Sequence, residues 1–98
     1  MRFCVKVTNY QKNPILNICD ANLLGKKISE NDLNMRISES YYGEKIVEQE
    51  EAETLLKNSS IINMVGEYTI SLSISLGIGS EKGIKKIDGV PFLIVFKM

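Results

Sequence analysis

Apolar and polar residues alternate from the start of the chain, which predicts a strand at the N-terminus. In the run Arg2 to Thr8, the apolar residues at positions 3, 5 and 7 share one side of an extended chain. Ile15 to Cys19 repeats the pattern, so we expect a hairpin that turns around Asn9 to Pro14. Pairing Val5 with Ile18 places Cys4 opposite Cys19, whereas a shift of two residues keeps the apolar pattern and separates the thiols.

Short elements are predicted after the hairpin. Asp20 is placed to cap a helical turn through Leu23 and Leu24, which Gly25 can end in a left-handed conformation. Lys26 to Ser29 and Leu33 to Ile37 are predicted strands, and the second alternates as if only one of its faces were covered. A layer of helices over a sheet is therefore expected.

Two helices are predicted in the second half of the chain, over about 48–57 and 66–76. Glu48 to Lys57 has carboxylates in its first turn and a lysine in its last, as the helix dipole favours. The segment from Ile61 to Ile78 is ambiguous, because apolar residues alternate with serines from Ile70 to Leu76, as in a strand. Apolar residues spaced by four, and Gly77 as a stop, favour a helix.

The C-terminal region is predicted to be a second hairpin. Ile84 to Ile87 and Phe92 to Lys97 flank a turn-forming segment from Asp88 to Pro91. The elements together predict an α+β fold: a two-layer sandwich in which a mostly antiparallel sheet of short strands carries both helices on one face. The strand Phe92 to Phe96 is apolar on both faces, so it is either a central strand or a dimer edge, and the oligomeric state stays open.

Composition adds limits to this picture. A chain of 98 residues, with 12 basic and 12 acidic side chains, makes one domain over 1–98 with no net field toward nucleic acid or an anionic membrane. The longest apolar run, Val90 to Phe96, is far shorter than the roughly 20 residues of a membrane helix. The N-terminus lacks an export signal, so we expect a soluble cytoplasmic protein whose two cysteines are thiols.

The absence of histidine removes the commonest general base and the commonest metal ligand. We therefore predict no catalytic residues, no metal site and no cofactor. The run Gly77 to Gly83 resembles a phosphate-binding loop only superficially, because it lacks the spacing and follows a helix where such a loop precedes one. A flexible connection is the simpler interpretation.

The segment Ser38 to Gly43 is the best candidate for a binding surface. Tyr41 and Tyr42 lie in a loop that ends at Gly43, and one ring can face outward to stack on a base or on a partner side chain. The alternative is that one tyrosine packs in the core and the other lies at its rim. Lys26 and Lys27, which can join Lys85 and Lys86 in one patch, are candidates for phosphate contacts, with surface solubilisation as the alternative.

Several short motifs together resemble a known family. Cys19-Asp20, Leu23-Leu24-Gly25-Lys26, Ile37 to Gly43, Asn63 to Glu67 and Gly89-Val90-Pro91 occur in an order and spacing similar to those of the archaeal domain-of-unknown-function family 424. The resemblance spans nearly the whole chain. It implies a stand-alone archaeal cytoplasmic protein with a two-layer α/β sandwich, in which Glu67 to Leu76 is helical.

The resemblance implies no specific activity, although relatives tend to be encoded near translation and ribosome-maturation genes, which suggests an RNA or ribosome connection. Two positions depart from the family pattern. Phe92 follows Gly-Val-Pro where relatives commonly have histidine, and Glu44 follows Tyr-Gly where relatives often have a second glycine. These departures weaken a catalytic role at the first position and a tight backbone contact at the second.

Three functions remain open from the sequence. The first is an RNA-binding or ribosome-associated protein that uses Tyr41, Tyr42, Lys26 and Lys27. The second is an assembly factor whose acidic helix, 48–57, meets a basic protein partner. The third, and least favoured, is a small enzyme with Cys19, Asp20 or Glu67 in a cleft.

Overall fold

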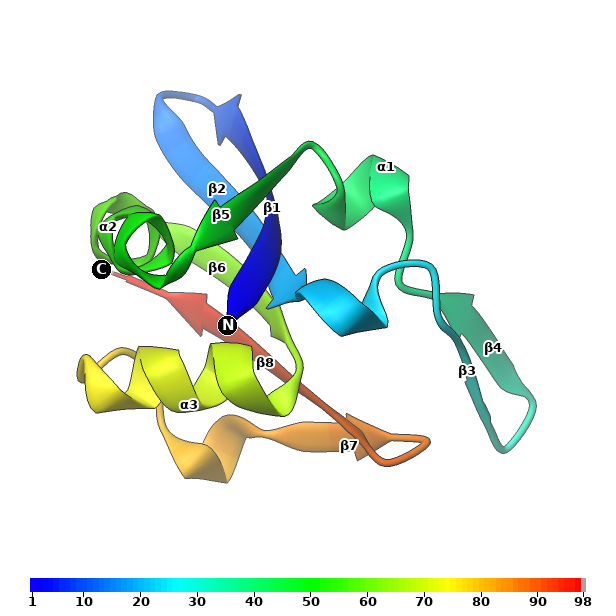
Figure 1. Ribbon diagram of the computed structural model, residues 1–98. Coiled ribbons are helices and arrows are strands. Elements are labelled where there is room, and N and C mark those ends of the chain that lie inside the picture. Colours follow the sequence, from blue (N-terminus) through cyan, green and yellow to red (C-terminus); the bar gives the residue numbers. More distant parts are fainter. Residues whose placement is uncertain (98) are drawn as a thin grey trace.

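The computed structural model describes residues 1–97, and within them six strands form one sheet, flanked by helices and a two-stranded ribbon (Figure 1). The sheet strands are β1 (Arg2–Tyr10), β2 (Asn13–Asp20), β5 (Lys45–Glu48), β6 (Ile61–Val65), β7 (Lys85–Ile87) and β8 (Val90–Phe96). The remaining elements are the 3-10 turns η1 (Ala21–Leu23) and η2 (Glu81–Gly83), the ribbon strands β3 (Lys27–Glu30) and β4 (Leu33–Arg36), and the helices α1 (Glu39–Tyr42), α2 (Gln49–Asn58) and α3 (Glu67–Ser75).

The strand order of the sheet is β5-β1-β2-β6-β8-β7, and the β2–β6 pair is the parallel one among antiparallel neighbours. The predicted α+β fold with a mostly antiparallel sheet is therefore confirmed. Of the two registers that the sequence left open for the first hairpin, the structure has the one in which Val5 pairs with Ile18 and Cys4 with Cys19.

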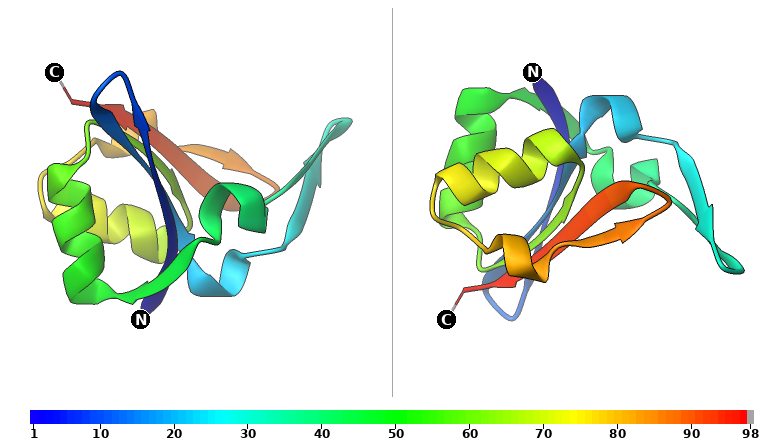
Figure 2. Two further views of the ribbon diagram at one scale, coloured as in Figure 1. Left: turned by 90° about the horizontal axis from the view of Figure 1, so that it is seen from above. Right: turned by 90° about the horizontal axis from the view of Figure 1, so that it is seen from below.

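Helices α2 and α3 lie on the same side of the sheet (Figure 2) and seal the main hydrophobic core. Odd-numbered residues of β1 and even-numbered residues of β2 point toward them, because side chains alternate along a strand. Burial of each large apolar side chain contributes about 1.5–3 kcal/mol. The core is built from the strand residues Phe3, Val5, Leu16, Ile18, Ile62 and Met64 and the helix residues Ala52, Leu56 and Ile70.

The first hairpin closes more tightly than the sequence predicts. Gln11 and Lys12, with φ of 50° and 69°, form a two-residue turn, so the predicted turn from Asn9 to Pro14 is wrong in extent. Positive φ at both positions matches the twist of the flanking strands, which explains why the ladder continues to Tyr10.

The C-terminal hairpin has the same kind of turn. Asp88 and Gly89 have φ of 52° and 76°, and Val90 and Pro91, predicted as part of the turn, belong to β8. Pro91 is tolerated in the strand where β8 meets the short edge strand β7.

Helix α3 settles the ambiguity between helix and strand in favour of the predicted helix. Two serine hydroxyls form hydrogen bonds with backbone carbonyls of the helix and of the turn that follows it. Ser73 Oγ donates to Ile78 O at 2.7 Å and Ser75 Oγ donates to Leu72 O at 2.6 Å. Gly77, with φ of 77°, follows the helix as expected for a stop.

The strands β3 and β4 form a separate ribbon rather than part of the main sheet (Figure 1). Gly25 N donates to Ile37 O at 2.6 Å, and Ile37 N donates to Lys26 O at 3.0 Å, so the base of the ribbon is closed. Leu33 is 47% exposed. The expectation that a helix covers this strand is therefore wrong, because the ribbon projects beyond the reach of both large helices.

Candidate functional site

The side of the sheet opposite α2 and α3 is divided into a covered half and an open half. η1, α1 and the β3–β4 ribbon gather over one end of this side (Figure 2). Beneath them a second apolar cluster contains the buried residues Cys4, Cys19, Ile28, Ile37, Val65 and Val90. The other end of the same strands carries no such cover over residues 1–97.

The two thiols belong to the covered half and are unsuited to nucleophilic catalysis. Cys4 and Cys19 are opposite each other, unlinked and almost completely buried. Burial, reinforced by the neighbouring Cys4, raises the pKa of Cys19 to about 12, and burial also raises the pKa of Cys4. Both groups therefore remain protonated at neutral pH, where a nucleophile must be a thiolate.

The open half presents two rows of side chains that run across four strands. The rows follow from the ladder register, in which Lys6 pairs with Asn17, Asn17 with Asn63, and Asn63 with Ile94. Two residues further along, the same strands align a second row. We call the two rows together the open face. It consists of Lys6, Thr8, Ile15, Asn17, Ile61, Asn63, Ile94 and Phe96.

Two of the four apolar members of the open face are well exposed, and the other two, Ile15 and Ile61, are half-buried. Ile94 is 58% exposed and Phe96 is 66% exposed, although both occupy a strand of the central sheet. The neighbouring strand β7 pairs with residues 90–92 of β8, so Ile94 and Phe96 lie past the end of that ladder. Exposed apolar side chains that adjoin one another on a rigid sheet mark a surface suited to binding.

A chain of amide hydrogen bonds orders the polar members. Asn63 Nδ2 donates to Asn17 Oδ1 at 2.7 Å, and Asn17 Nδ2 donates to Tyr41 O at 3.1 Å. The carbonyl acceptor fixes the orientation of the first amide and hence of the second. The Oδ1 atom of Asn63 is thus left as an acceptor near the middle of the open face.

Helix α1 forms the border of the open face and carries the predicted tyrosines. The segment was expected to be a loop, and this expectation is wrong, because Tyr42 N donates to Ser38 O at 3.0 Å and Gly43 N to Glu39 O at 2.7 Å. Tyr41 is 65% exposed beside the open face. Tyr42 packs against the second cluster, and burial raises its pKa.

Gly43 has a structural explanation. A Cβ at this position would lie 2.8 Å from the Glu39 Cα and 2.9 Å from its carbonyl oxygen. Gly43 therefore lets α1 end tightly, which places Tyr41 at the border of the sheet. Lys6 Nζ donates to Ser40 O at 2.7 Å and ties the same helix to β1.

Apart from the open face, a hollow lies where the parallel strands β2 and β6 end. Asp20 and Gly66 follow these two strands, and the hollow, of about 220 Å³, also contains Lys26 and Glu67. Clefts at the carboxyl ends of parallel strands are common ligand sites. Two of the predicted site residues, Lys26 and Glu67, are therefore brought together here and away from Tyr41.

Asp20 already occupies the position that an anion would take in this hollow. Its carboxylate accepts hydrogen bonds from Tyr68 N at 3.2 Å, Thr69 N at 2.7 Å and Thr69 Oγ1 at 2.7 Å. The expected capping of η1 by this side chain is wrong, since Asp20 makes no hydrogen bond there and caps α3 instead. The amides that open α3 are thus satisfied within the protein.

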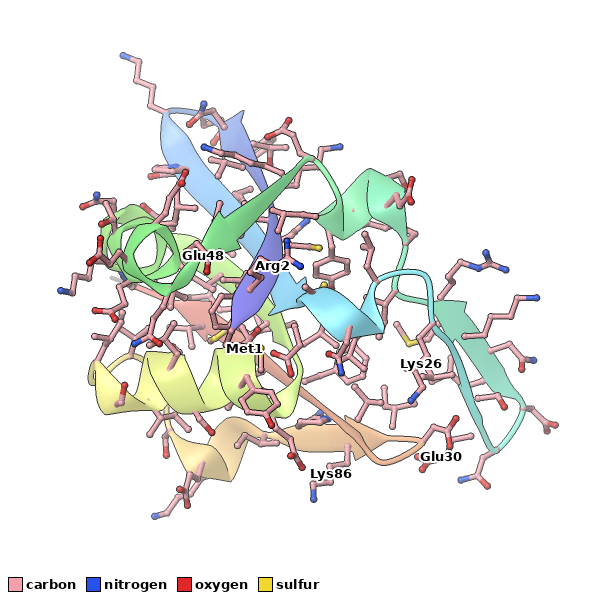
Figure 3. All side chains as sticks on the ribbon, in the orientation of Figure 1. Met1, Arg2, Lys26, Glu30, Glu48 and Lys86 are labelled. Carbon is pink, nitrogen blue, oxygen red and sulfur yellow. The ribbon has the colours of Figure 1, made fainter. Side chains whose placement is uncertain are left out.

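The predicted patch of Lys26, Lys27, Lys85 and Lys86 stays a prediction. The C-terminal hairpin does lie beside β3, because Ser29 N donates to Asp88 Oδ2 at 3.2 Å. Lys26, Lys27 and Lys86 nevertheless line three different hollows. Figure 3 shows Lys26 turned toward the β7–β8 turn and Lys86 pointing away from the body.

The glycine-rich segment after α3 serves packing. A Cβ at Gly79 would lie 2.9 Å from Val95 Cγ2 and 3.0 Å from Leu93 Cδ2. The backbone therefore approaches β8 closely, and this accounts for the glycine without a phosphate ligand.

The acidic helix uses part of its charge internally. Lys45 Nζ forms an ion pair with Glu51, and Gln49 Nε2 donates to Glu53 at 3.0 Å. Recognition of a basic protein partner through this helix stays a prediction.

Comparison with known proteins places the chain in a family. The family model described as protein of unknown function (DUF424) matches residues 8–98. The chain belongs to the DUF424 family. A crystal structure of an uncharacterized conserved protein from Methanopyrus kandleri is similar to this DUF424 chain, with a TM-score of 0.81 and 23% sequence identity, covering 100% of this chain and 95% of that one. No curated protein matches the sequence.

The fold of this DUF424 chain is shared with the Methanopyrus protein, and neither comparison specifies an activity. Within residues 1–97 no helix is long and apolar enough to cross a membrane, and no three histidine, cysteine or acidic side chains are grouped to hold a metal ion. Of the two positions expected to depart from the family pattern, Phe92 packs against the second cluster and Glu44 is exposed.

The sequence predicts that one ring of the pair Tyr41 and Tyr42 can face outward, but it did not lead us to the open face of this DUF424 chain. A signal for it is present in the sequence. Asn17 and Asn63 each occupy the centre of an otherwise apolar strand, in Ile15 to Cys19 and in Ile61 to Val65. An amide that interrupts an apolar strand needs partners or solvent, and two such strands predict a polar row across the sheet.

Proposed function

We propose that this protein binds single-stranded RNA on the open face of its sheet. The observation that carries the proposal is the pair of exposed rings, Tyr41 at 65% and Phe96 at 66% exposure, which flank rows of amide and aliphatic side chains on a rigid sheet. Bases stack on exposed aromatic rings irrespective of sequence, and each stacked base contributes about 1–3 kcal/mol. Sheet surfaces with exposed aromatics are a recurrent platform for single-stranded RNA.

The polar members of the open face suit the same ligand. The Asn63 Oδ1 acceptor and the second N–H of each asparagine amide match the donors and acceptors on base edges. Lys6, at the border, supplies a positive charge within reach of a phosphate, although its ammonium also donates to Ser40 O. An apolar partner docked on this surface would leave the hydrogen-bonding groups of these amides unsatisfied.

The balanced charge of the chain defines how the RNA is held. With 12 basic and 12 acidic residues, the molecule has no long-range attraction for a polyanion. Stacking and local contacts must therefore supply most of the affinity. Such binding is expected to be only moderately sensitive to salt.

The test is fluorescence anisotropy with labelled, unstructured RNA of about ten nucleotides, a length within the range of one single-strand binding domain. We expect Tyr41→Ala and Phe96→Ala each to weaken binding by roughly 5-fold to 100-fold, the equivalent of one lost stack. Tyr68→Ala is the matched control, because this 55% exposed tyrosine lies on α3, across the sheet.

Urea midpoints of all three variants establish that each is folded. Absence of RNA binding by the unmodified protein at tens of micromolar would overturn the proposal. The same conclusion follows if all three tyrosine and phenylalanine substitutions weaken binding equally.

A further inference from the structure

The β3–β4 ribbon places two cations directly opposite each other. Lys27 pairs with Arg36 across the ribbon, and Ser29 pairs with Asn34. Because side chains alternate along each strand, these four residues share one face, which we call the ribbon face. All four are exposed, and they line a common hollow.

Like charges directly opposite each other on a ladder destabilise the pair. Within residues 1–97, neither Lys27 nor Arg36 has a side-chain hydrogen bond or an ion pair that offsets this repulsion. The acid of the ribbon strands, Glu30, lies on the opposite face and accepts a hydrogen bond from Asp88 N at 3.3 Å, while the Asp88 carboxylate accepts one from Ser29 N at 3.2 Å. The repulsion therefore has no explanation inside the described chain.

The opposite side of the ribbon accounts for its folding. Ile28 is 1% exposed and packs in the second cluster, where Met35 contacts it from the neighbouring strand. The base is closed by the hydrogen bonds of Ile37 with Gly25 and Lys26, and the β7–β8 turn is attached through Asp88. The two cations are thus carried on a fixed backbone, so a ligand has to order the two side chains but not the strands that carry them.

We infer that the ribbon face binds phosphate groups of the same RNA that the open face stacks. The guanidinium of Arg36 can donate two parallel hydrogen bonds to a phosphate, and the ammonium of Lys27 supplies a second charge. The Ser29 hydroxyl and the Asn34 amide add uncharged donors. A phosphate between the two cations removes the repulsion that the free ribbon carries.

The position of the ribbon supports a shared ligand. It projects from the same side of the sheet as α1, whose Tyr41 borders the open face (Figure 2). This inference rests on the proposed RNA binding, and it assigns the ribbon the phosphate contacts that the open face, with Lys6 as its one cation, lacks.

The experiment compares the salt dependence of RNA binding in two double variants that remove the same charge. We expect Lys27→Gln with Arg36→Gln to weaken binding about tenfold at low salt. It should also reduce the slope of log Kd against log salt by about 0.7, because the one phosphate held between the two cations contributes about 0.7 on a single strand. Lys85→Gln with Lys86→Gln, an exposed lysine pair on β7, should keep the slope of the unmodified protein.

Two further measurements make the test sharper. Arg36→Lys keeps the charge but removes the paired donors, so it should weaken binding several-fold while leaving the salt slope unchanged. Removing the like charges should also raise the urea midpoint at low salt.

Equal slopes for both double variants and the unmodified protein would overturn the inference and leave the open-face proposal standing. If the unmodified protein binds no RNA, both fail. A lower urea midpoint in the Lys27→Gln, Arg36→Gln variant would show that the pair is not repulsive and would remove the argument from charge.

Discussion

Gly66, which directly follows β6, leaves less room for a side chain than the other glycines of the described chain. Its φ is 110°, and an added Cβ would lie 2.5 Å from Asp20 Oδ2 and 2.6 Å from Oδ1. A side chain here both strains the backbone and displaces the carboxylate that caps α3. The position is therefore defined by one interaction that joins β2, β6 and α3.

We expect Gly66→Ala to lower the free energy of unfolding by about 3 kcal/mol or more, since strain and the loss of charged hydrogen bonds add. Gly77→Ala is the matched control. Its φ of 77° is also positive, but no atom lies within 4 Å of the added Cβ, so only about 1–2 kcal/mol is expected. Urea unfolding of both variants measures the difference, and equal costs would contradict the role of Asp20.

The buried thiol pair predicts a loss of stability at alkaline pH. The pKa of Cys19 rises from an ordinary value of 9.0 to about 12 in the folded protein. Between these values the unfolded chain has released the proton and the folded chain still holds it. Unfolding is then favoured as pH rises, by up to about 1.4 kcal/mol per pH unit.

The measurement is the urea midpoint from pH 7 to pH 10.5, which should be constant to about pH 9 and then fall. Cys19→Ala should flatten the decline. Part of the slope should remain, because the pKa values of Cys4 and Tyr42 are raised in the same direction. An unchanged alkaline slope in the variant would show that Cys19 is not its cause.

Asp20 shows what a sequence can and cannot predict at this scale. Its residue type and its place after an apolar strand identify a helix cap. Which helix it caps depends on the pairing of β2 with β6, which brings α3 next to a residue 49 positions earlier in the chain. Local patterns contain no information on such pairing.

At the scale of elements, α3 is where local pattern and tertiary structure compete most closely. Ser71 is exposed, whereas Ser73 is buried and donates to Ile78 O. The two serines are two residues apart, so in a strand they would lie on the same face and respond alike. In a helix they face different surroundings.

We expect Ser71→Ala to stabilise the protein by about 0.5 kcal/mol, because alanine has the higher helix propensity. Ser73→Ala should destabilise it by about 1–2 kcal/mol, because the Ile78 carbonyl loses its hydrogen bond. Thermal unfolding followed by circular dichroism separates the two effects. A destabilising Ser71→Ala would argue against the helix.

The elements that the sequence predicted well share one property. The first hairpin and α2 have their periodicity and capping signals within about ten residues of themselves. The two ribbon strands were also predicted to within one residue, whereas their separation from the main sheet and the helical form of α1 were not, because these depend on packing against the second cluster. The open face was not predicted either, because its rows combine residues from four strands that are distant in sequence.

On the scale of the whole molecule, the two sides of the sheet serve different needs. The side under α2 and α3 is sealed and gives stability, while the opposite side is only half covered. Tyr41 was found from its sequence context, but its partners on the open face were not. Lys26 and Lys27, adjacent in sequence, line different hollows.

The parallel pairing of β2 with β6 also has a consequence for how the protein folds. β1 and β2 join through a two-residue turn, whereas Asn17 and Asn63 meet across a sequence separation of 46. Local pairs close sooner than distant ones, so the first hairpin forms while the inner edge of β2 is still unpaired. Until β6 pairs with β2, the inner edge of β2 and its apolar side chains are exposed on the nascent chain. Self-association through this edge then competes with folding.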